Sequence, residues 1–369
     1  MTLRFSLDGH LASPIVVFDL GGTWFRSAIA EPCGRISNIR SRTAISCASE
    51  PARTVALLQA DLVEYVINDV AARRSSRGDL GNQVAIALGA ALDQRTGVVW
   101  NSGPLWGASS EPFDLPAALR RKVPGIEWNV VNDVTAALVA QLRRANTISN
   151  GTTVFVTIST GIAARSWSTA LGGIPVDGLV GLQGEIGHVP VSCVFRETII
   201  HNRCGCGGAD HLNAFSSGRG INALLRTLSQ AYPDVAAMLG NAIDPQPTRA
   251  FAMALRRQCP VAREILTMVV DPLARVLLTA LAMDPTISRV FLGGGVVDGI
   301  GRSRYLAALT AQLKAYGAYQ KTEHCPRFFE LLLQAVDARD LGLAGAAYAM
   351  QTALNRIGNV IAMGHHAPT

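Results

Sequence analysis

Short runs of β-branched residues alternate with long alanine- and leucine-rich segments along this chain, and no other feature restricts its fold as strongly. Such alternation is typical of α/β proteins, in which helices cover a sheet. No period of roughly 20 to 50 residues recurs, so a solenoid is not expected. The expected strands are Ile15–Phe18, Gln83–Leu88, Trp128–Val131, Thr152–Ile158 and Arg289–Leu292, and the expected helices are 52–74, 134–144, 217–230, 261–283, 303–316 and 341–356.

The chain has 369 residues, which is more than one hydrophobic core usually holds, so we expect two lobes. Strands near residues 18 and 158 both end in glycine-containing turns, and each opens a half of similar layout. This layout fits a duplicated fold with a cleft between the halves. Because 49% of the residues are hydrophobic and 16% are charged, the chain can bury a large core, and disorder is not expected.

Charge and cysteine content restrict the partners and the compartment. The net charge is +6, but Lys and Arg are scattered and their densest groups are short clusters, so we expect no nucleic-acid partner. Seven cysteines without a framework spacing predict a reducing compartment, here the cytoplasm. No membrane contact is expected, because Arg263, Glu264, Asp271, Pro272 and Arg275 interrupt the most apolar helix.

A glycine turn follows the first expected strand, in the stretch VVFDLGGTWFR at residues 16–26. Gly21 and Gly22 leave backbone N–H groups open to an anion, because no side chain stands in the way. A strand followed by two glycines is also a common tight hairpin, and this alternative stays open. Thr23 and Arg26 favour an anion site, since a hydroxyl and a guanidinium add phosphate donors.

Two further strands end in glycine turns, in VFVTISTGIAARS at 154–166 and in RVFLGGGVVDG at 289–299. The first turn gathers hydroxyls and backbone amides, and with the turn at 21–23 it indicates the phosphate chain of a nucleotide. The second lets the backbone lie against a flat ring, although a plain strand-to-helix turn is equally open. The residues of these two turns are Ser159, Thr160, Gly161, Gly293, Gly294 and Gly295.

The stretch WNVVNDVTAALVAQ at residues 128–141 brings Asn132 and Asp133 to the beginning of an expected helix. Either residue is suited to cap that helix. A carboxylate at a strand end that faces a phosphate site can also accept a proton from an attacking alcohol. Spacing alone does not separate the cap from the base.

Cys204 and Cys206 lie one residue apart in HNRCGCGGADHLNAFSSG, residues 201–218. Two cysteines at this spacing are weak evidence for a metal. Taken alone, the stretch is either a metal site or a glycine loop that carries two thiols.

Together these motifs resemble the ROK family of the actin-like ATPase superfamily, which also includes the hexokinases, from about residue 15 to about residue 350. The family comprises sugar kinases and sugar-responsive transcriptional repressors. The resemblance implies an α/β two-lobe actin-like ATPase (ribonuclease H-like) fold with an interlobe cleft, a small domain of residues 1–130 and 341–369, and a large domain of residues 131–340. The motifs are DLGGT-x-x-R, NSGPLW, NDVTAA, the Thr/Ser-Gly turn, GLQGEIGH, CGCGG and LGGG.

The resemblance implies an ATP-dependent kinase in which Asp133 matches the base that deprotonates the attacking sugar hydroxyl. Asp19 stands where it can hold Mg²⁺ through water. The substrate-binding residues implied are Gly89, Asn101, Gly103, Asn132, Asp133, Glu185, His188 and Asn213. The nucleotide-binding residues implied are Asp19, Gly21, Gly22, Thr23, Arg26, Ser159, Thr160, Gly161, Gly293, Gly294 and Gly295.

A structural zinc ion is also implied by the resemblance. Family members commonly bind zinc through the histidine of the GEIGH motif, here His188, and three cysteines. Cys204 and Cys206 match the first two cysteines, and His211 stands at the third. Since histidine is an ordinary zinc ligand, a site of two histidines and two cysteines is chemically sound. His201 is a competing ligand, and loss of the metal is the alternative.

Two departures from the family pattern bear on the substrate and the nucleotide. Asn213 stands where the family has a glutamate that binds sugar hydroxyls near the anomeric carbon. An amide carries no charge and makes weaker hydrogen bonds than a carboxylate, so a substrate with a different ring remains open. Ser159 and Ala163 replace glycines of the second phosphate turn.

From these features we expect a kinase of the primary hydroxyl of a glucose-like substrate, with glucose ranked first from the frequency of such enzymes in the family. A C7-cyclitol kinase, an N-acetylhexosamine kinase and a non-catalytic sugar-binding protein are the alternatives. A repressor is not expected, because about 14 residues precede the first strand, fewer than a helix-turn-helix needs. We expect the two lobes to close over the substrate and exclude water, and we expect a homodimer.

Overall fold

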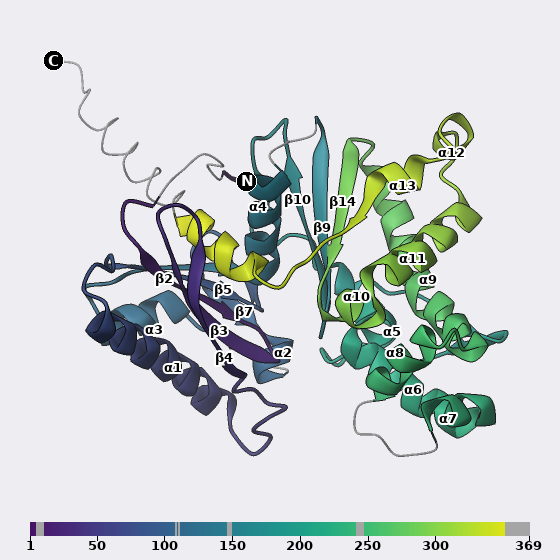
Figure 1. Ribbon diagram of the computed structural model, residues 1–369, viewed down its shortest axis with the longest axis horizontal. Coiled ribbons are helices and arrows are strands. Elements are labelled where there is room, and N and C mark those ends of the chain that lie inside the picture. Colours follow the sequence, from purple (N-terminus) through teal and green to yellow (C-terminus); the bar gives the residue numbers. More distant parts are fainter. Residues whose placement is uncertain (5–10, 108, 110, 146–149, 241–246, 351–369) are drawn as a thin grey trace. The chain divides into compact units, whose positions relative to one another are not determined.

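The computed structural model describes residues 1–4, 11–107, 109, 111–145, 150–240 and 247–350, and its elements are drawn in Figure 1. Contacts divide the chain into two compact units. The first unit consists of Met1–Ile148, Arg165–Gln183 and Ala338–Thr369. The second unit consists of Ser149–Ala164 and Gly184–Asp337.

A five-stranded sheet with the order β4-β3-β2-β5-β8 forms the centre of the first unit. β2, β5 and β8 run parallel to one another, and β3 and β4 continue the sheet in antiparallel pairs. The strands are β2 (Ile15–Leu20), β3 (Trp24–Ala30), β4 (Ile36–Thr43), β5 (Gln83–Leu88) and β8 (Glu127–Asn132). Short pairs join β1 (Thr2–Leu3) to β11 (Ile174–Pro175) and β6 (Ala91–Leu92) to β7 (Val99–Asn101).

Helices cover both faces of this sheet, as Figure 1 shows. Val16 and Phe18 belong to one core cluster with side chains of α1. Ile15 and Val17 belong to another, with side chains of α4 and of the helix Leu341–Met350. This division follows from the strand itself, because successive side chains point to opposite faces. A strand buried on both faces reads as an unbroken apolar run, which is why β2 was recognisable in the sequence.

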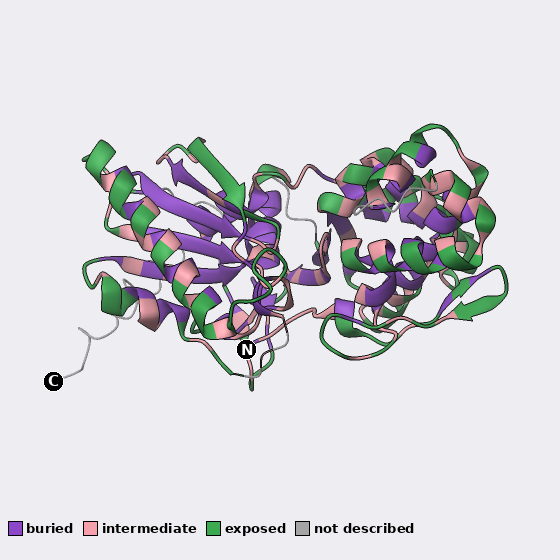
Figure 2. Cartoon of the chain, turned by 90° about the horizontal axis from the view of Figure 1, so that it is seen from below, coloured by how far each residue is buried: buried purple, intermediate pink, exposed green. Residues whose placement is uncertain are grey.

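The outer strand β4 differs from the inner strands, because most of its side chains are exposed. Figure 2 shows this contrast between buried inner strands and an exposed edge. Arg40 and Arg42 lie on β4, and charged residues on an edge strand discourage pairing with another chain.

Capping residues mark the ends of the helices in the first unit. We expected a helix over 52–74, and the structure has α1 two to three residues later, because the Thr54 hydroxyl accepts from Leu57 N–H and caps it. Of the expected segment 341–356, residues 341–350 are helical and the others lie outside the described residues. The remaining bounds are α1 (Val55–Ser76), α2 (Gly103–Trp106), α3 (Leu115–Lys122) and α4 (Asp133–Ala145).

The second unit is built on a four-stranded sheet with the order β10-β9-β14-β15. β9, β14 and β15 are parallel neighbours, and β10 follows β9 through a short turn. The strands are β9 (Thr152–Ile158), β10 (Ile162–Ser168), β14 (Ile287–Gly293) and β15 (Leu333–Ala335), with a separate hairpin of β12 (Cys193–Phe195) and β13 (Thr198–Ile200).

The core of the second unit is organised around the long helix α9. α9 is apolar and long enough to cross a membrane by composition alone, but its side chains are part of the core cluster, as in the core helix of a soluble protein. The helices are η1 (Ile186–His188), α5 (Leu212–Ser216), α6 (Gly218–Ala231), α7 (Pro233–Leu239), α8 (Pro247–Arg256), α9 (Pro260–Met283), α10 (Gly295–Ile300), α11 (Arg302–Tyr316), α12 (Lys321–His324) and α13 (Phe328–Leu332).

The boundaries between the compact units differ from the domain boundaries expected from the sequence. The expected boundary before residue 131 would cut through β8 and assign α4 to the large domain, but the contacts place both elements in the first unit. The reason is close packing: at Gly345 an added Cβ would lie only 1.8 Å from the Ala136 carbonyl oxygen of α4. The backbone of the helix Leu341–Met350 therefore lies directly against α4.

Candidate active site and metal centre

Asp19 and Arg26 form an ion pair beside the first glycine turn. They stand directly opposite each other in the antiparallel pair of β2 and β3, so their side chains share one face of the sheet. The Arg26 guanidinium also donates to the Arg339 carbonyl oxygen and lies 4.0 Å from the Asp340 carboxylate. The structure thus pairs Arg26, which the sequence predicted to bind phosphate, with Asp19, which it predicted to hold Mg²⁺.

Burial raises the pKa of the Asp19 carboxyl, and the Arg26 cation opposes this shift. The Asp340 carboxylate adds to the rise. The chain closes tightly behind Asp19, because a Cβ added to Gly342 would lie 2.5 Å from its carboxylate. Glycine at position 342 therefore allows the helix Leu341–Met350 to begin against the Asp19 side chain.

Three residues expected to belong to the site meet at Gly89. A Cβ on Gly89 would lie 3.4 Å from Asp133 Oδ2 and 3.4 Å from the Cα of Gly21. The Gly89 N–H donates to the Leu20 carbonyl oxygen at 2.9 Å, which holds the ends of β2 and β5 together. The turn at Gly21 and the carboxylate of Asp133 therefore both lie next to Gly89.

Asn132 caps α4. Its Oδ1 accepts from the N–H groups of Val134 at 2.8 Å and Thr135 at 3.1 Å, and its Nδ2 donates to the Ala90 carbonyl oxygen at 2.9 Å. Asn132 is only 3% exposed. Asp133 begins the helix, and one of its carboxylate oxygens, Oδ1, accepts from Val134 N–H.

A second loop of the first unit lies against the glycine turn. A Cβ on Gly22 would lie 2.4 Å from the Cβ of Pro104, so the turn and the start of α2 are in contact. The Ser102 hydroxyl donates to the Gly89 carbonyl oxygen at 2.6 Å. Asn101 Oδ1 is buried without a hydrogen-bond partner in the described part of the chain, and nothing lies within 4 Å of a Cβ added to Gly103.

The two expected turns of the second unit are neighbours. β9 and β14 are parallel, with Thr157 opposite Gly293, so the turns that follow them lie at one edge of the sheet. A Cβ on Gly295 would lie 3.6 Å from the Ser159 hydroxyl, and one on Gly294 would lie 2.5 Å from the Ile158 carbonyl oxygen. Gly294 also has a φ of 114°, which favours glycine.

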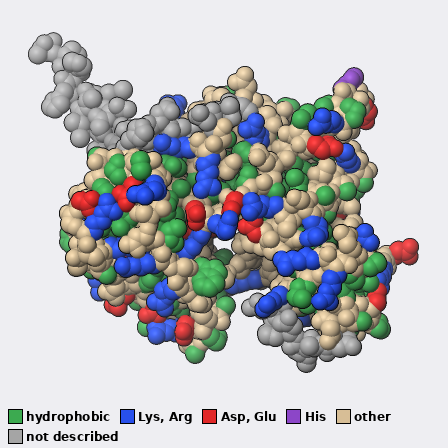
Figure 3. All heavy atoms as spheres, viewed as in Figure 1, with side chains coloured by type: hydrophobic (Ala, Val, Ile, Leu, Met, Phe, Trp, Pro, Cys, Tyr) green, Lys and Arg blue, Asp and Glu red, His purple; other side chains and the backbone are tan. Residues whose placement is uncertain are grey.

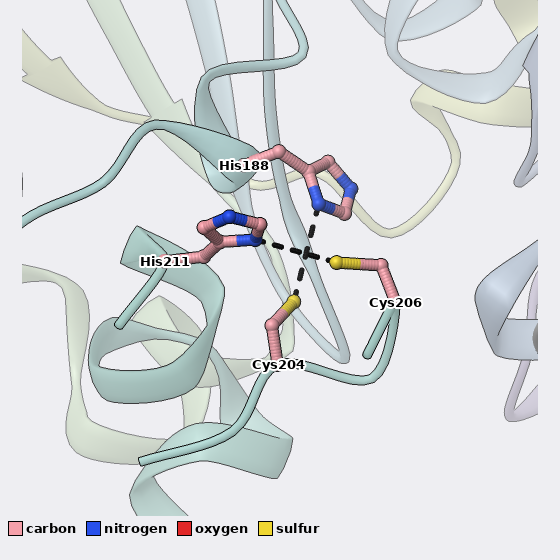
Figure 4. A group of neighbouring side chains, drawn as sticks. All are labelled: His188, Cys204, Cys206 and His211. Atoms are coloured by element: carbon pink, nitrogen blue, oxygen red, sulfur yellow. Dashed lines mark hydrogen bonds between the residues drawn. The ribbon is translucent and has the colours of Figure 1, made fainter. Parts of the chain in front are cut away.

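His188, Cys204, Cys206 and His211 point toward one another in Figure 4. They come from η1, from the loop after β13 and from the residue before α5. Their ligand atoms lie within 4.8 Å of one another, with 3.3 Å from Cys206 Sγ to His211 Nδ1 and 3.9 Å from Cys204 Sγ to His188 Nδ1. His201 lies outside the cluster and pairs with Asp210 at 2.7 Å.

This cluster fits a tetrahedral zinc ion. Zinc bonds of 2.0 to 2.3 Å place neighbouring ligand atoms roughly 3.3 to 3.8 Å apart, close to the two separations found. Two imidazole nitrogens and two sulfurs are a donor set that zinc prefers. Gly208 lets the loop close on the cluster, because a Cβ there would lie 2.4 Å from His211 Cε1.

Burial also affects the protonation of two of these residues. It lowers the pKa of His188, although the nearby Glu185 charge raises it and His211 lowers it further. It raises the pKa of the Cys204 thiol, whereas hydrogen bonds from the Cys206 backbone and the Asn213 side chain oppose that rise. A neutral imidazole is the form that binds metal.

Asn213 and Glu185, both expected to bind substrate, lie beside the metal cluster. Glu185 directly precedes η1, and its carbonyl oxygen accepts from His188 N–H at 3.1 Å. Asn213 Oδ1 accepts from Ile162 N–H at 2.7 Å, immediately after the second phosphate turn. The side chain of Asn213 is therefore directed toward β10.

Charged side chains are spread over the surface of both units. On the face drawn in Figure 3, Lys and Arg side chains are interspersed with acidic ones. The basic residues on this face are thus scattered among acidic ones, and Arg26 pairs with Asp19.

Sequence reasoning missed several residues that shape the site. Gly342 and Asp340 approach Asp19 from a segment more than 300 residues away, and Ser102 orients Gly89. The signal in the sequence was indirect: Gly342 and Gly345 stand in an otherwise helix-forming alanine-rich segment. Glycine inside a helix often marks close contact with another backbone.

Comparisons with known proteins identify a family and its relatives. The family described as the ROK family matches residues 15–353. A 2-epi-5-epi-valiolone 7-kinase of Actinoplanes sp. is 37% identical over 321 residues, covering 85% of this chain and 86% of that protein. A C(7)-cyclitol 7-kinase of Streptomyces hygroscopicus is 28% identical, covering 85% and 87%. A ROK family glucokinase from Streptomyces griseus, solved with glucose and AMPPNP, superposes with a TM-score of 0.67 at 21% identity, covering 90% and 98%.

Proposed function

The chain belongs to the ROK family, and on this basis we propose that it is an ATP-dependent kinase of the primary hydroxyl of a C7-cyclitol of the valiolone type. The two-lobe actin-like fold and the enzyme class expected from the sequence, a carbohydrate kinase, are confirmed. Glucose, which the sequence analysis ranked first, is not specifically supported. A C7-cyclitol was one of the alternatives.

The proposed substrate class depends on Asn213. The residue stands where the sequence analysis expected a carboxylate that reads hydroxyls near an anomeric carbon, and its Oδ1 is already bonded to Ile162 N–H. A carbocyclic substrate has no ring oxygen and no anomeric carbon, so it does not require that carboxylate. The similarity to two kinases named for C7-cyclitols supports the same choice.

In the proposed reaction Asp133 accepts the proton of the attacking hydroxyl. Asn132 already caps α4, so the Asp133 carboxylate is not required as the cap and can lie against Gly89 and the phosphate turn. A carboxylate placed within hydrogen-bond reach of an alcohol acts as a general base in phosphoryl transfer. Gly21 N–H donates to the Trp24 carbonyl oxygen at 3.0 Å and closes the turn, and Gly22 carries no side chain that would obstruct a phosphate.

Asp19 is the residue that would hold Mg²⁺, through water. Bound Mg²⁺ neutralises charge on the phosphates during transfer. A single carboxylate beside a phosphate turn suits this ion, which keeps several of its water ligands. Arg26 favours the ionised form of Asp19, which that role requires.

The structural zinc ion is also part of the proposal, with His188, Cys204, Cys206 and His211 as its ligands. A cytoplasmic location stays a prediction, supported by seven cysteines that all lie in the described residues and form no disulfide. The homodimer stays a prediction as well, and light scattering on the purified protein tests it.

Turnover measurements test the proposed substrate. ADP release from MgATP is measured with a valiolone-type cyclitol, glucose, mannose and N-acetylglucosamine as acceptors. We expect the cyclitol to exceed glucose in kcat/KM by roughly tenfold or more, because the pocket discriminates by contacts to ring substituents. Turnover of glucose at an equal or higher kcat/KM would contradict the cyclitol assignment.

Asp133→Asn tests the base. We expect it to lower kcat by ~10² to 10⁴-fold while the acceptor still binds in calorimetry, because only proton transfer is lost. Asp114→Asn is the matched control. It makes the same chemical change as Asp133→Asn, but at an exposed residue that caps α3. Wild-type turnover by the Asp133→Asn variant would show that another group takes the proton.

A further inference from the structure

The Asn213 side chain lies between two parts of the second unit that the proposed function treats separately. One is the metal cluster, and the other is the turn of Ser159, Thr160 and Gly161 that connects β9 and β10. Asn213 is the second residue of α5, two positions after His211. All of these residues belong to the same compact unit.

The Asn213 amide contacts a backbone N–H and lies near a thiol. Oδ1 accepts from Ile162 N–H at 2.7 Å, directly after the turn. Asn213 also lies two residues after His211 in the metal loop, and its amide lies near enough to Cys204 to oppose the rise in the pKa of that thiol. An amide both accepts and donates, so it can join a backbone N–H to a metal-bound thiolate, whereas an ionised carboxylate can only accept.

Two glycines lie against the Asn213 amide. A Cβ added to Gly187 would lie 2.5 Å from Asn213 Nδ2 and 2.6 Å from its Oδ1. A Cβ added to Gly161 would lie 3.7 Å from the same Oδ1. The glycine before His188 thus makes space for the amide.

A second contact holds the other end of the turn. Gly218 N–H, at the start of α6, donates to the Ser159 carbonyl oxygen at 2.7 Å. Within the turn, Ser159 N–H donates to the Gly161 carbonyl oxygen at 2.9 Å. The backbone of the turn is therefore fixed at Ser159 by α6 and at Ile162 by Asn213.

We propose that Asn213 is a positioning residue that fastens the β9–β10 turn to the metal loop, so that it sets nucleotide affinity and does not contact the phosphoryl acceptor. The proposal rests on the assignment of this turn to nucleotide binding in the proposed function. It differs from the role in substrate binding that the sequence led us to expect for Asn213. An amide beside a ligating sulfur is the kind of outer contact that orients metal ligands.

Two variants separate the contact of Asn213 with Ile162 from its effect on Cys204. Asn213→Ala removes both and leaves Ile162 N–H without its partner. We expect it to raise the Kd of MgADP, measured by calorimetry, and the KM of ATP by roughly 5- to 100-fold. The KM of the acceptor should stay at the wild-type value.

Asn213→Asp keeps an acceptor for Ile162 N–H but replaces the amide near Cys204 with a negative charge. It should restore most of the MgADP affinity that Asn213→Ala loses. Its zinc affinity, measured by competition with a chelator, should fall on the order of 10- to 100-fold, as for other lost outer contacts. This variant keeps the proposal testable even if Asn213→Ala does not fold.

Ser216→Ala is the matched control. Ser216 lies in the same helix, and its buried Oγ has no hydrogen-bond partner within the described residues. We expect wild-type values of nucleotide Kd, acceptor KM and zinc affinity. A similar loss of MgADP affinity in this variant would mean that any change in α5 disturbs the turn, and the role of the amide would be rejected.

The results of these experiments separate a failure of the positioning role of Asn213 from a failure of the proposed substrate. A rise in acceptor KM with unchanged MgADP affinity in both Asn213 variants would overturn the positioning role and make Asn213 a substrate ligand. If the wild type binds MgADP but phosphorylates none of the acceptors, the proposed substrate fails. The MgADP and zinc measurements still decide the role of Asn213 in that case, because neither needs turnover.

Discussion

Asn132 and Asp133 are neighbours in the sequence, yet the fold gives them different surroundings. Asn132 is buried and uses both ends of its amide within the protein, whereas Asp133 lies half-buried beside Gly89. Asp19 and Arg26 illustrate the same principle, because strand register pairs them across β2 and β3. At the scale of single residues, backbone geometry decides which polar side chain is structural and which remains for chemistry.

Arg26→Gln tests the control of Asp19 by its ion pair. Removing the cation should raise the pKa of Asp19 further, because burial then acts with less opposition. If ionised Asp19 supports catalysis, the acidic limb of the kcat/KM profile moves to higher pH. Arg26→Lys keeps the charge and should shift the limb less. Profiles that coincide for wild type and Arg26→Gln would contradict this role.

The same shift has a consequence for stability. The pKa of Asp19 in the folded protein is raised above its ordinary value of 3.8, so protonation favours the folded state. This contribution is fully present below the unfolded pKa and is lost as pH rises through the folded pKa. In Arg26→Gln the loss should extend to higher pH, which thermal unfolding at a series of pH values would detect.

At the scale of elements, the helix Leu341–Met350 brings the end of the described chain onto the sheet that begins it. Gly342 meets Asp19 and Gly345 meets Ala136, so two glycines in one helix allow contact with a strand and with α4. Small residues cost the helix some intrinsic stability, and here they permit close packing. The element therefore positions Asp19 as well as covering the core.

Gly342→Ala tests this packing. The added methyl group would lie 2.5 Å from the Asp19 carboxylate, so we expect a loss of about 1 to 3 kcal/mol in the free energy of unfolding, measured with urea. ADP release should fall as well, because Asp19 is displaced. Gly299→Ala in α10 is the control, since its Cβ would meet nothing within 4 Å. It should be neutral or stabilising by up to about 1 kcal/mol. Equal effects of the two substitutions would argue against the contact.

At the scale of the whole molecule, each compact unit has a core of its own. One cluster fills the second unit, and two clusters lie on the faces of the first unit's sheet. The metal cluster belongs entirely to the second unit. A bound metal stabilises only the structure that its ligands join.

Metal removal should therefore act on one unit. In calorimetric unfolding we expect a strong chelator to lower the transition of the second unit and leave that of the first unchanged. Purified protein should carry about one equivalent of zinc, and a Cys204→Ser Cys206→Ser double variant should carry none. Zinc-free wild type that unfolds at the same temperature with and without chelator would exclude the site.

The strands and long helices of this protein were accessible from its sequence because their signals are local. β5 and β9 have the predicted bounds, β2 extends beyond the prediction at its end, and β8 and β14 extend beyond it by one or two residues at both ends. A run of apolar β-branched residues bounded by glycine identifies a buried strand without knowledge of its neighbours. The motifs that assigned the family are local in the same sense.

Contacts between distant segments were decided only by the tertiary structure. The substrate-binding role that the sequence predicted for Asn213 stays a prediction, and only the fold showed that its amide accepts from Ile162 N–H. The sequence did not show that Asn132 caps α4. It also contained no direct sign that Gly342 lies against Asp19. The physical reason is that residue type and spacing specify which groups a segment offers, while hydrogen bonds and close approaches depend on which other segment packs against it.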